Sequence, residues 1–143
     1  MDDLVQWLTA RLDTDEQIAR EATKGPWRNA PTARHHATAS GRSEEAVFAS
    51  PPDVGAMVVA VTGEAVERRN LVNAEFIAAH DPTRVLREID AKRQLLARYE
   101  ELRAASKEQG LIGDVTEEYQ DFLLRLLALP YADKPGYREE WAP

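Results

Sequence analysis

A non-helical interval at residues 27–63 divides the chain into two stretches of helical periodicity, and this interruption constrains the fold most strongly. Before it, apolar residues recur every three or four positions, which predicts a helix within residues 1–24. Lys24-Gly25-Pro26 ends that helix, because glycine favours a helix C-terminus and proline cannot donate into a continuing helix. After the interval the helical spacing returns, which predicts a helical core over residues 64–129.

The interval itself has the composition of strands and turns. Two β-favouring runs, Ala46–Ala49 and Ala56–Val61, flank the turn-forming segment Ser50–Gly55. This arrangement predicts a small β-hairpin within residues 27–63, while residues 29–41 are compatible with either a further strand or a loop. The expected fold class is α+β and mostly helical, with about four helices and the hairpin between the first and the second.

Three helices are expected in the second stretch. The first begins at Gly63 and ends near His80, and Asp81-Pro82 then supplies an N-cap carboxylate and a proline at the first helical position of the next. That helix continues to about Gly110, which gives it a length of roughly 40 Å at 1.5 Å per residue. A domain of 143 residues has a radius of gyration of only about 14–15 Å. We therefore expect part of this helix to bend, fray or meet another chain.

The last helix and the tail complete the chain. Asp114–Glu117 resembles a capping box, and the helix that it begins ends at Pro130. Residues 130–143 are rich in proline and hold three aromatic residues that are costly to leave in water. We expect this aromatic tail to pack back onto the helices, within a single domain over residues 1–143.

Charge and composition exclude several classes of function. The 25 acidic and 18 basic residues give a net charge of −7, and the acidic excess lies at the two ends of the chain. Nucleic-acid binding is disfavoured, because a phosphate polyanion repels an acidic protein. There is no cysteine, no apolar run long enough to span a membrane and no leader segment, so we expect a cytoplasmic location.

Four stretches carry a resemblance: Leu126–Trp141, Met1–Val5, Ala22–Trp27 and His80–Arg93. They are similar to a family of small proteins from streptomycetes and their phages that is catalogued as a domain of unknown function. Gly25-Pro26-Trp27 and Asn73–Ala78 also resemble early-region accessory proteins of temperate phages. The resemblance implies a phage or actinobacterial setting, not a reaction. Many members carry His at the position of Lys134 and cysteines that this chain lacks, so no metal role carries over.

Few residues suggest chemistry. Arg84, Arg87 and Arg93 are candidates for binding an anionic ligand, but we favour the explanation that such a strip is ion-paired within its helices. His35-His36 lacks placed partner ligands, so we expect no metal site there. Glu117 and Asp121 stand four apart, as in helical magnesium-dependent nucleotide hydrolases, but no second carboxylate pair faces them. We expect no cofactor, and the familiar catalytic motifs are absent, which lowers the expectation of an enzyme without removing it.

Aromatic residues are the candidates for contact with a protein partner. Buried aromatic side chains dominate binding hot spots, and this role would fall to Trp27, Tyr131, Tyr137 and Trp141. The other interpretation is that they hold the tail against the core.

The function most consistent with these patterns is a small, acidic, non-enzymatic interaction protein of the phage or actinobacterial accessory type. It would bind a host protein and form a homodimer through the long helix. The alternative is a small-ligand protein that sequesters an anionic nucleotide or hydrolyses it with a metal. An exposed apolar patch would favour the first, and a hollow lined by the arginines would favour the second.

Overall fold

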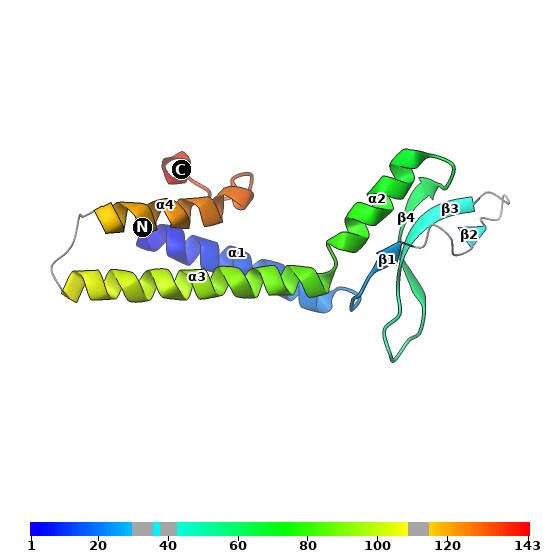
Figure 1. Cartoon of the computed structure of the whole chain (residues 1–143), viewed down its shortest axis with the longest axis horizontal. Helices are drawn as coiled ribbons and strands as arrows, with labels where there is room; N and C mark the ends of the chain where they lie inside the picture. Colours follow the sequence, from blue (N-terminus) through cyan, green and yellow to red (C-terminus); the bar gives the residue numbers. More distant parts are fainter. Residues whose placement is uncertain (30–35, 38–42, 109–114) are drawn as a thin grey trace. The chain divides into compact units, whose positions relative to one another are not determined.

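The computed structural model describes residues 1–29, 36–37, 43–108 and 115–143. Its order of elements confirms the expected α+β class, mostly helical with a small sheet between the first two helices (Figure 1). The elements are α1 (Asp2–Glu21), β1 (Arg28–Asn29), β2 (His36–Ala37), β3 (Ser43–Ala49), β4 (Met57–Glu64), α2 (Arg68–Ala79), α3 (Pro82–Glu108), α4 (Val115–Ala128), and the short 3₁₀ helices η1 (Leu129–Tyr131) and η2 (Glu139–Trp141).

The residues group into two compact units. Unit 1 comprises Met1–Glu16 and Glu88–Pro143, and unit 2 comprises Gln17–Arg87. The expectation of a single domain over residues 1–143 stays a prediction.

Unit 2 contains the sheet. β3 and β4 pair antiparallel from Ala49↔Met57 to Glu44↔Glu64, which confirms the predicted hairpin. Two short strands also pair antiparallel with β3: β1 through Arg28↔Phe48, and β2, which lies within the stretch left open at residues 29–41, through His36↔Glu44. Helix α2 packs on β3 and β4, and the buried apolar side chains of this layer are Ala46, Val47, Ala49 and Ala74.

Helix α2 begins four residues later than the helical core was expected to begin. β4 continues to Glu64, and Gly63 adopts a φ of +125°, a conformation that L side chains rarely adopt. A Cβ at Gly63 would also lie 2.5 Å from the side-chain nitrogen of Asn70, which donates a hydrogen bond to the Glu64 carbonyl at 2.9 Å. The close approach of Asn70 therefore fixes the turn from strand to helix.

A buried carboxylate joins two segments of unit 2. The side chain of Asp81 accepts hydrogen bonds from the backbone N–H of Arg84 at 2.8 Å and from that of Trp27 at 3.2 Å. The first bond caps α3, as the Asp81-Pro82 pair predicted, while the second was not foreseen. Gly25 lies against this carboxylate, because a Cβ there would be 2.4 Å from the Asp81 oxygen. Helix α1 ends at Glu21, three residues before the expected boundary at residue 24.

Unit 1 is built from its parts of α1 and α3, together with α4 and the tail. Helices α1 and α3 run antiparallel, since Asp2 pairs with Arg103 near one end and Asp13 pairs with Arg93 near the other. Its core side chains come from all three helices and the tail: Leu4, Leu8, Leu12, Ile89, Leu96, Tyr99, Leu124, Ala128, Tyr131 and Trp141.

The aromatic tail lies against α1. The Trp7 ring is 5.4 Å from the Trp141 ring and 5.6 Å from the Tyr137 ring, centroid to centroid. Trp7 also donates its indole N–H to the Pro135 carbonyl at 3.2 Å. These contacts remove large apolar rings from water, which explains why a proline-rich segment is held in place.

Two buried tyrosines in unit 1 predict a loss of stability in alkaline solution. Tyr99 donates to Asp121 at 2.8 Å and Tyr131 donates to Asp15 at 2.9 Å. Burial and then the carboxylate partner raise the pKa of both hydroxyls above the ordinary value. Their contribution is present below the unfolded-state pKa of about 10 and is lost as pH rises through the folded-state values.

We therefore expect the melting temperature to fall steeply above about pH 10. Melting curves of the wild type and of Tyr99→Phe across the alkaline range would check this. The variant should be less stable at neutral pH but show a shallower alkaline decline. An identical alkaline slope in both proteins would show that the Tyr99 hydroxyl does not contribute.

Candidate functional site

The apolar stripe that the sequence marks on α4 faces solvent. Tyr119 is 62% exposed, and Phe122, Leu123 and Leu126 are between 41% and 44% exposed. The side of α4 that the structure buries is a different one, formed by Gln120, Leu124 and Ala128. We call the exposed surface the α4 face; it comprises Tyr119, Phe122, Leu123 and Leu126 of α4, Leu129 of η1 and Leu95 of α3.

This arrangement follows from the distribution of charge around α4. Successive residues of an α-helix are rotated by roughly 100° about the helix axis. In this projection the charged side chains from Glu118 onward fall within about 60° of one another, so more than roughly 200° of the circumference carries no charge. These residues are Glu118, Asp121 and Arg125. Asp121 is bonded to Tyr99, and Arg125 donates to the Ala142 carbonyl at 3.0 Å. A surface helix needs an apolar stripe only about 100° wide to pack on its own protein. The uncharged part of α4 is wider than that, so α4 has a second apolar side in addition to the one that unit 1 buries.

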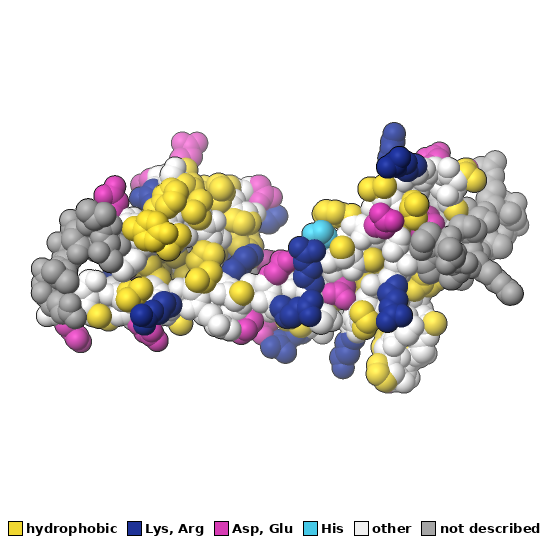
Figure 2. Space-filling view, in the orientation of Figure 1, with side chains coloured by type: hydrophobic (Ala, Val, Ile, Leu, Met, Phe, Trp, Pro, Cys, Tyr) yellow, Lys and Arg dark blue, Asp and Glu magenta, His cyan; other side chains and the backbone are white. Residues whose placement is uncertain are grey.

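A groove lies beside the α4 face, between α3 and α4. Its volume is about 260 Å³, and its lining residues are Leu95, Arg98, Tyr99, Leu102, Gln120, Leu123, Leu124, Leu126 and Leu127. Figure 2 shows hydrophobic side chains gathered over α4. Arg98 is the one lining residue with a full charge, and it pairs with Glu101 at 3.0 Å. The groove therefore suits an apolar side chain and offers little to an anionic ligand.

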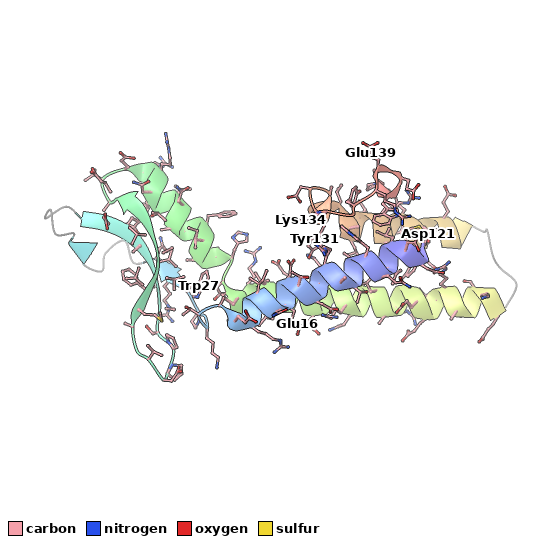
Figure 3. All side chains as sticks on the ribbon, turned by 180° about the vertical axis from the view of Figure 1, so that it is seen from behind. Glu16, Trp27, Asp121, Tyr131, Lys134 and Glu139 are labelled. Atoms are coloured by element: carbon pink, nitrogen blue, oxygen red, sulfur yellow. The ribbon has the colours of Figure 1, made fainter. Side chains whose placement is uncertain are left out.

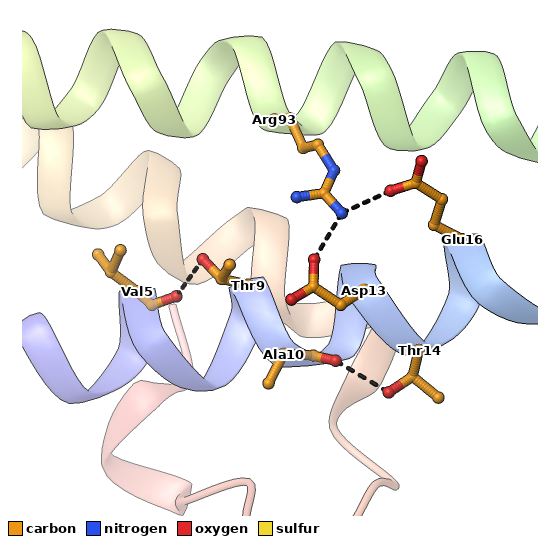
Figure 4. A network of polar contacts seen from close by, with 7 residues as sticks. All are labelled: Val5, Thr9, Ala10, Asp13, Thr14, Glu16 and Arg93. Atoms are coloured by element: carbon orange, nitrogen blue, oxygen red, sulfur yellow. Dashed lines mark hydrogen bonds and ion pairs between the residues drawn. The ribbon is translucent and has the colours of Figure 1, made fainter.

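The three candidate arginines are placed differently. Arg93 in unit 1 is held between two carboxylates of α1, at 2.6 Å from Asp13 and 2.7 Å from Glu16 (Figure 4). Hydrogen bonds and the opposite charges raise the pKa of Arg93, with Asp13 the main cause. Arg84 and Arg87 lie in unit 2, where Arg84 donates to the Ala79 carbonyl at 3.1 Å. Arg93 thus serves the contact between α1 and α3, an ion pairing between two helices where the sequence suggested pairing within one helix.

A hollow of about 390 Å³ in unit 2 also differs from the expected ligand site. It is lined by Ala19, Arg20, Lys24, Gly25, Pro82, Thr83 and Leu86. Its basic residues are Arg20 and Lys24, so it does not use the arginines that the sequence singled out.

The four candidate aromatic residues are engaged within the protein. Tyr131 and Trp141 are only 6% and 5% exposed, and Tyr137 is half-buried against Trp7. Trp27 in unit 2 is half-buried and donates its indole N–H to the Thr23 carbonyl at 2.8 Å. Figure 3 shows the positions of Trp27 and Tyr131 on the ribbon. The structure uses all four in packing, and a role in partner binding stays a prediction for them.

Comparison with known proteins identifies the family of this chain and nothing more specific. The whole chain, residues 1–143, matches a family described as "Family of unknown function (DUF6221)". The chain belongs to this family. No curated protein and no solved structure matches it. Membership of DUF6221 therefore assigns no reaction and no partner, and function has to be argued from the structure.

The metal-binding hypotheses for this DUF6221 member fall largely outside what the structure describes. His35 and the side chains of His36 and Glu117 lie outside the described residues. Within residues 1–29, 44–108 and 118–143, no group of three or more His, Asp or Glu side chains is placed to hold a metal ion. In the same described part, no helix combines the length and the apolar character that crossing a membrane requires.

The exposed side of α4 was missed by sequence reasoning, although its residues were noted. Tyr119, Phe122, Leu123 and Leu126 stand at helical spacing, a pattern that usually marks the side of a helix that faces the core. The overlooked signal is the second apolar set on the same helix, which includes Leu124 and Ala128. Helix α4 thus has two apolar sides, and the fold of unit 1 buries one of them.

Proposed function

We propose that this DUF6221 member is a non-enzymatic interaction protein that binds another protein chain through the α4 face. The observation that supports the proposal is the exposed aromatic and aliphatic surface of α4 beside an apolar groove. Contiguous apolar surface of this kind marks interaction sites in folded proteins. Aromatic residues are also enriched, and charged residues depleted, at the centres of protein interfaces.

The proposal covers a host protein and a second copy of the chain as partners. The accessory role in a phage or an actinobacterium that the sequence resemblance implies belongs to the same proposal. The small-ligand alternative has weaker support, because Arg93 is already neutralised by Asp13 and Glu16. We accordingly expect no change in melting temperature with nucleotides, cyclic dinucleotides or divalent metals, since a ligand of the folded state would raise it.

Site-specific photo-crosslinking in the cell tests the proposal. A benzophenone amino acid replaces Phe122 in one variant and Phe76 in the matched control. Phe76 is also an exposed phenylalanine on a helix, 64% exposed on α2. We expect protein adducts from position 122 and few from position 76. Adducts from position 76 with none from position 122 would contradict the assignment of the α4 face.

A further inference from the structure

We propose that the occupant of the α4 face is a second copy of this chain, in a two-fold symmetric dimer. In this dimer Phe122 of each copy enters the groove between α3 and α4 of the other. The inference rests on the proposed function, and it names the partner that the α4 face binds.

The shape of the surface supports a symmetric contact. A two-fold interface brings the same patch of both copies together, so that patch must hold both a projecting side chain and a hollow that receives it. The α4 face has both. Phe122 is 44% exposed and is not one of the lining residues of the groove.

The groove also has room for the ring. Its volume is about 260 Å³. An apolar cavity of roughly 150 Å³ is enough to hold benzene. A phenyl ring therefore fits, and the leucines on either side of the groove would surround it with apolar contacts.

The charges around the groove favour an identical partner over a charged one. A partner recognised by charge requires unpaired charges of one sign at the margin of its site. Here Arg98 of the groove is paired with Glu101, and Asp121 accepts a hydrogen bond from Tyr99. A second copy brings the same apolar residues, so the contact needs no opposite charge from the partner.

The exposed area agrees with what a dimer needs. The six side chains of the α4 face are between 41% and 62% exposed. Together they present roughly 500 Å² of apolar surface, at the upper end of what a monomer exposes in one patch. A standard interface buries about 800 Å² per partner, of which the apolar centre is one part and a polar rim the rest. The α4 face therefore supplies an apolar centre of suitable size.

Sedimentation velocity over a wide range of protein concentration tests the dimer. We expect the wild type to shift from the 16.0 kDa mass of one chain to twice that mass. Phe122→Glu should remain monomeric over the same range, because it would place a charge in the apolar groove. The matched control Phe76→Glu should associate like the wild type, and circular dichroism should show both variants equally helical.

Salt provides an independent readout. Each copy carries a net charge of −7, so two copies repel one another at low ionic strength. The Debye length falls from about 10 Å at 0.1 M to about 3 Å at 1 M salt, which weakens that repulsion. We expect the dimer to become tighter as salt increases, whereas a contact based on opposite charges would weaken.

Three results would overturn the inference: a wild type that stays monomeric at every concentration, a dimer that Phe122→Glu leaves intact, and a dimer that salt weakens. Its failure is distinguishable from failure of the proposed function. A monomeric wild type that still forms adducts with a different protein from position 122 overturns only the second copy as partner. A monomeric wild type with no adducts from position 122 overturns both.

Discussion

Replacing Trp141 with alanine is expected to lower the free energy of unfolding of unit 1 by about 3–5 kcal/mol. Trp141 is only 5% exposed, packs 5.4 Å from Trp7 and 5.9 Å from Tyr137 between ring centroids, and lies beneath the Arg138 guanidinium. Truncation would leave a cavity and release the tail from α1. Urea denaturation followed by circular dichroism measures the loss.

Two controls separate loss of packing from loss of any aromatic ring. Trp141→Phe keeps part of the contact with Trp7 and should lose less than half as much stability. Tyr119→Ala removes a ring that is 62% exposed, so the monomer should lose well under about 1 kcal/mol. A small loss for Trp141→Ala, equal to that for Tyr119→Ala, would contradict the packing of the tail against α1.

Replacing Asp81 with alanine is expected to destabilise unit 2 by about 2–4 kcal/mol. The substitution removes the cap of α3 and also leaves the Trp27 N–H without its acceptor. Asp81 is 8% exposed, so water would not readily replace the lost carboxylate. Thermal and urea unfolding of the variant would measure the effect.

Asp81→Asn is the matched control for the cap. Asparagine is as good an N-cap as aspartate, but its amide group offers one acceptor oxygen where the carboxylate offers two. We expect this variant to recover part of the lost stability, because only one of the two N–H groups loses its partner. Equal stability of Asp81→Ala and the wild type would show that the bonds to Arg84 and Trp27 contribute nothing.

Local signals in the sequence predicted the parts of the fold that depend on neighbouring residues. Asp81-Pro82 marked the start of α3 because a cap and its proline are adjacent in the chain. The β3–β4 hairpin was predicted for the same reason, since its strands are joined by a short turn-forming segment. The pairing of β1 with β3 was not predicted, because two residues at Arg28–Asn29 are too few to show a period.

Periodicity fails where a helix has two apolar sides. Tyr119, Phe122 and Leu126 stand at the spacing typical of a core-facing stripe, yet the structure buries Leu124 and Ala128. Helical spacing alone does not rank two such stripes, because the choice depends on what α1, α3 and the tail present to α4. Leu95 on α3 shows the same effect, since it stands four residues before the buried Tyr99 and is 55% exposed.

The candidate site could be predicted only as a list of residue types. The sequence identifies the arginines as charged residues but does not identify their partners. The carboxylates Asp13 and Glu16 that neutralise Arg93 lie about 80 positions away in the chain. Contacts over such separations follow from the packing of whole helices, which a single sequence does not specify.

Isotope-filtered NMR on a mixture of carbon-13-labelled and unlabelled copies tests the central claim most directly. It detects proton contacts between two copies and identifies the side chains that make them. We predict contacts from the Phe122 ring of one copy to the methyl groups of Leu95 and Leu102 of the other. A spectrum without these contacts, or with contacts only at Val72 and Phe76 of α2, would contradict the assignment of the α4 face as the site of association.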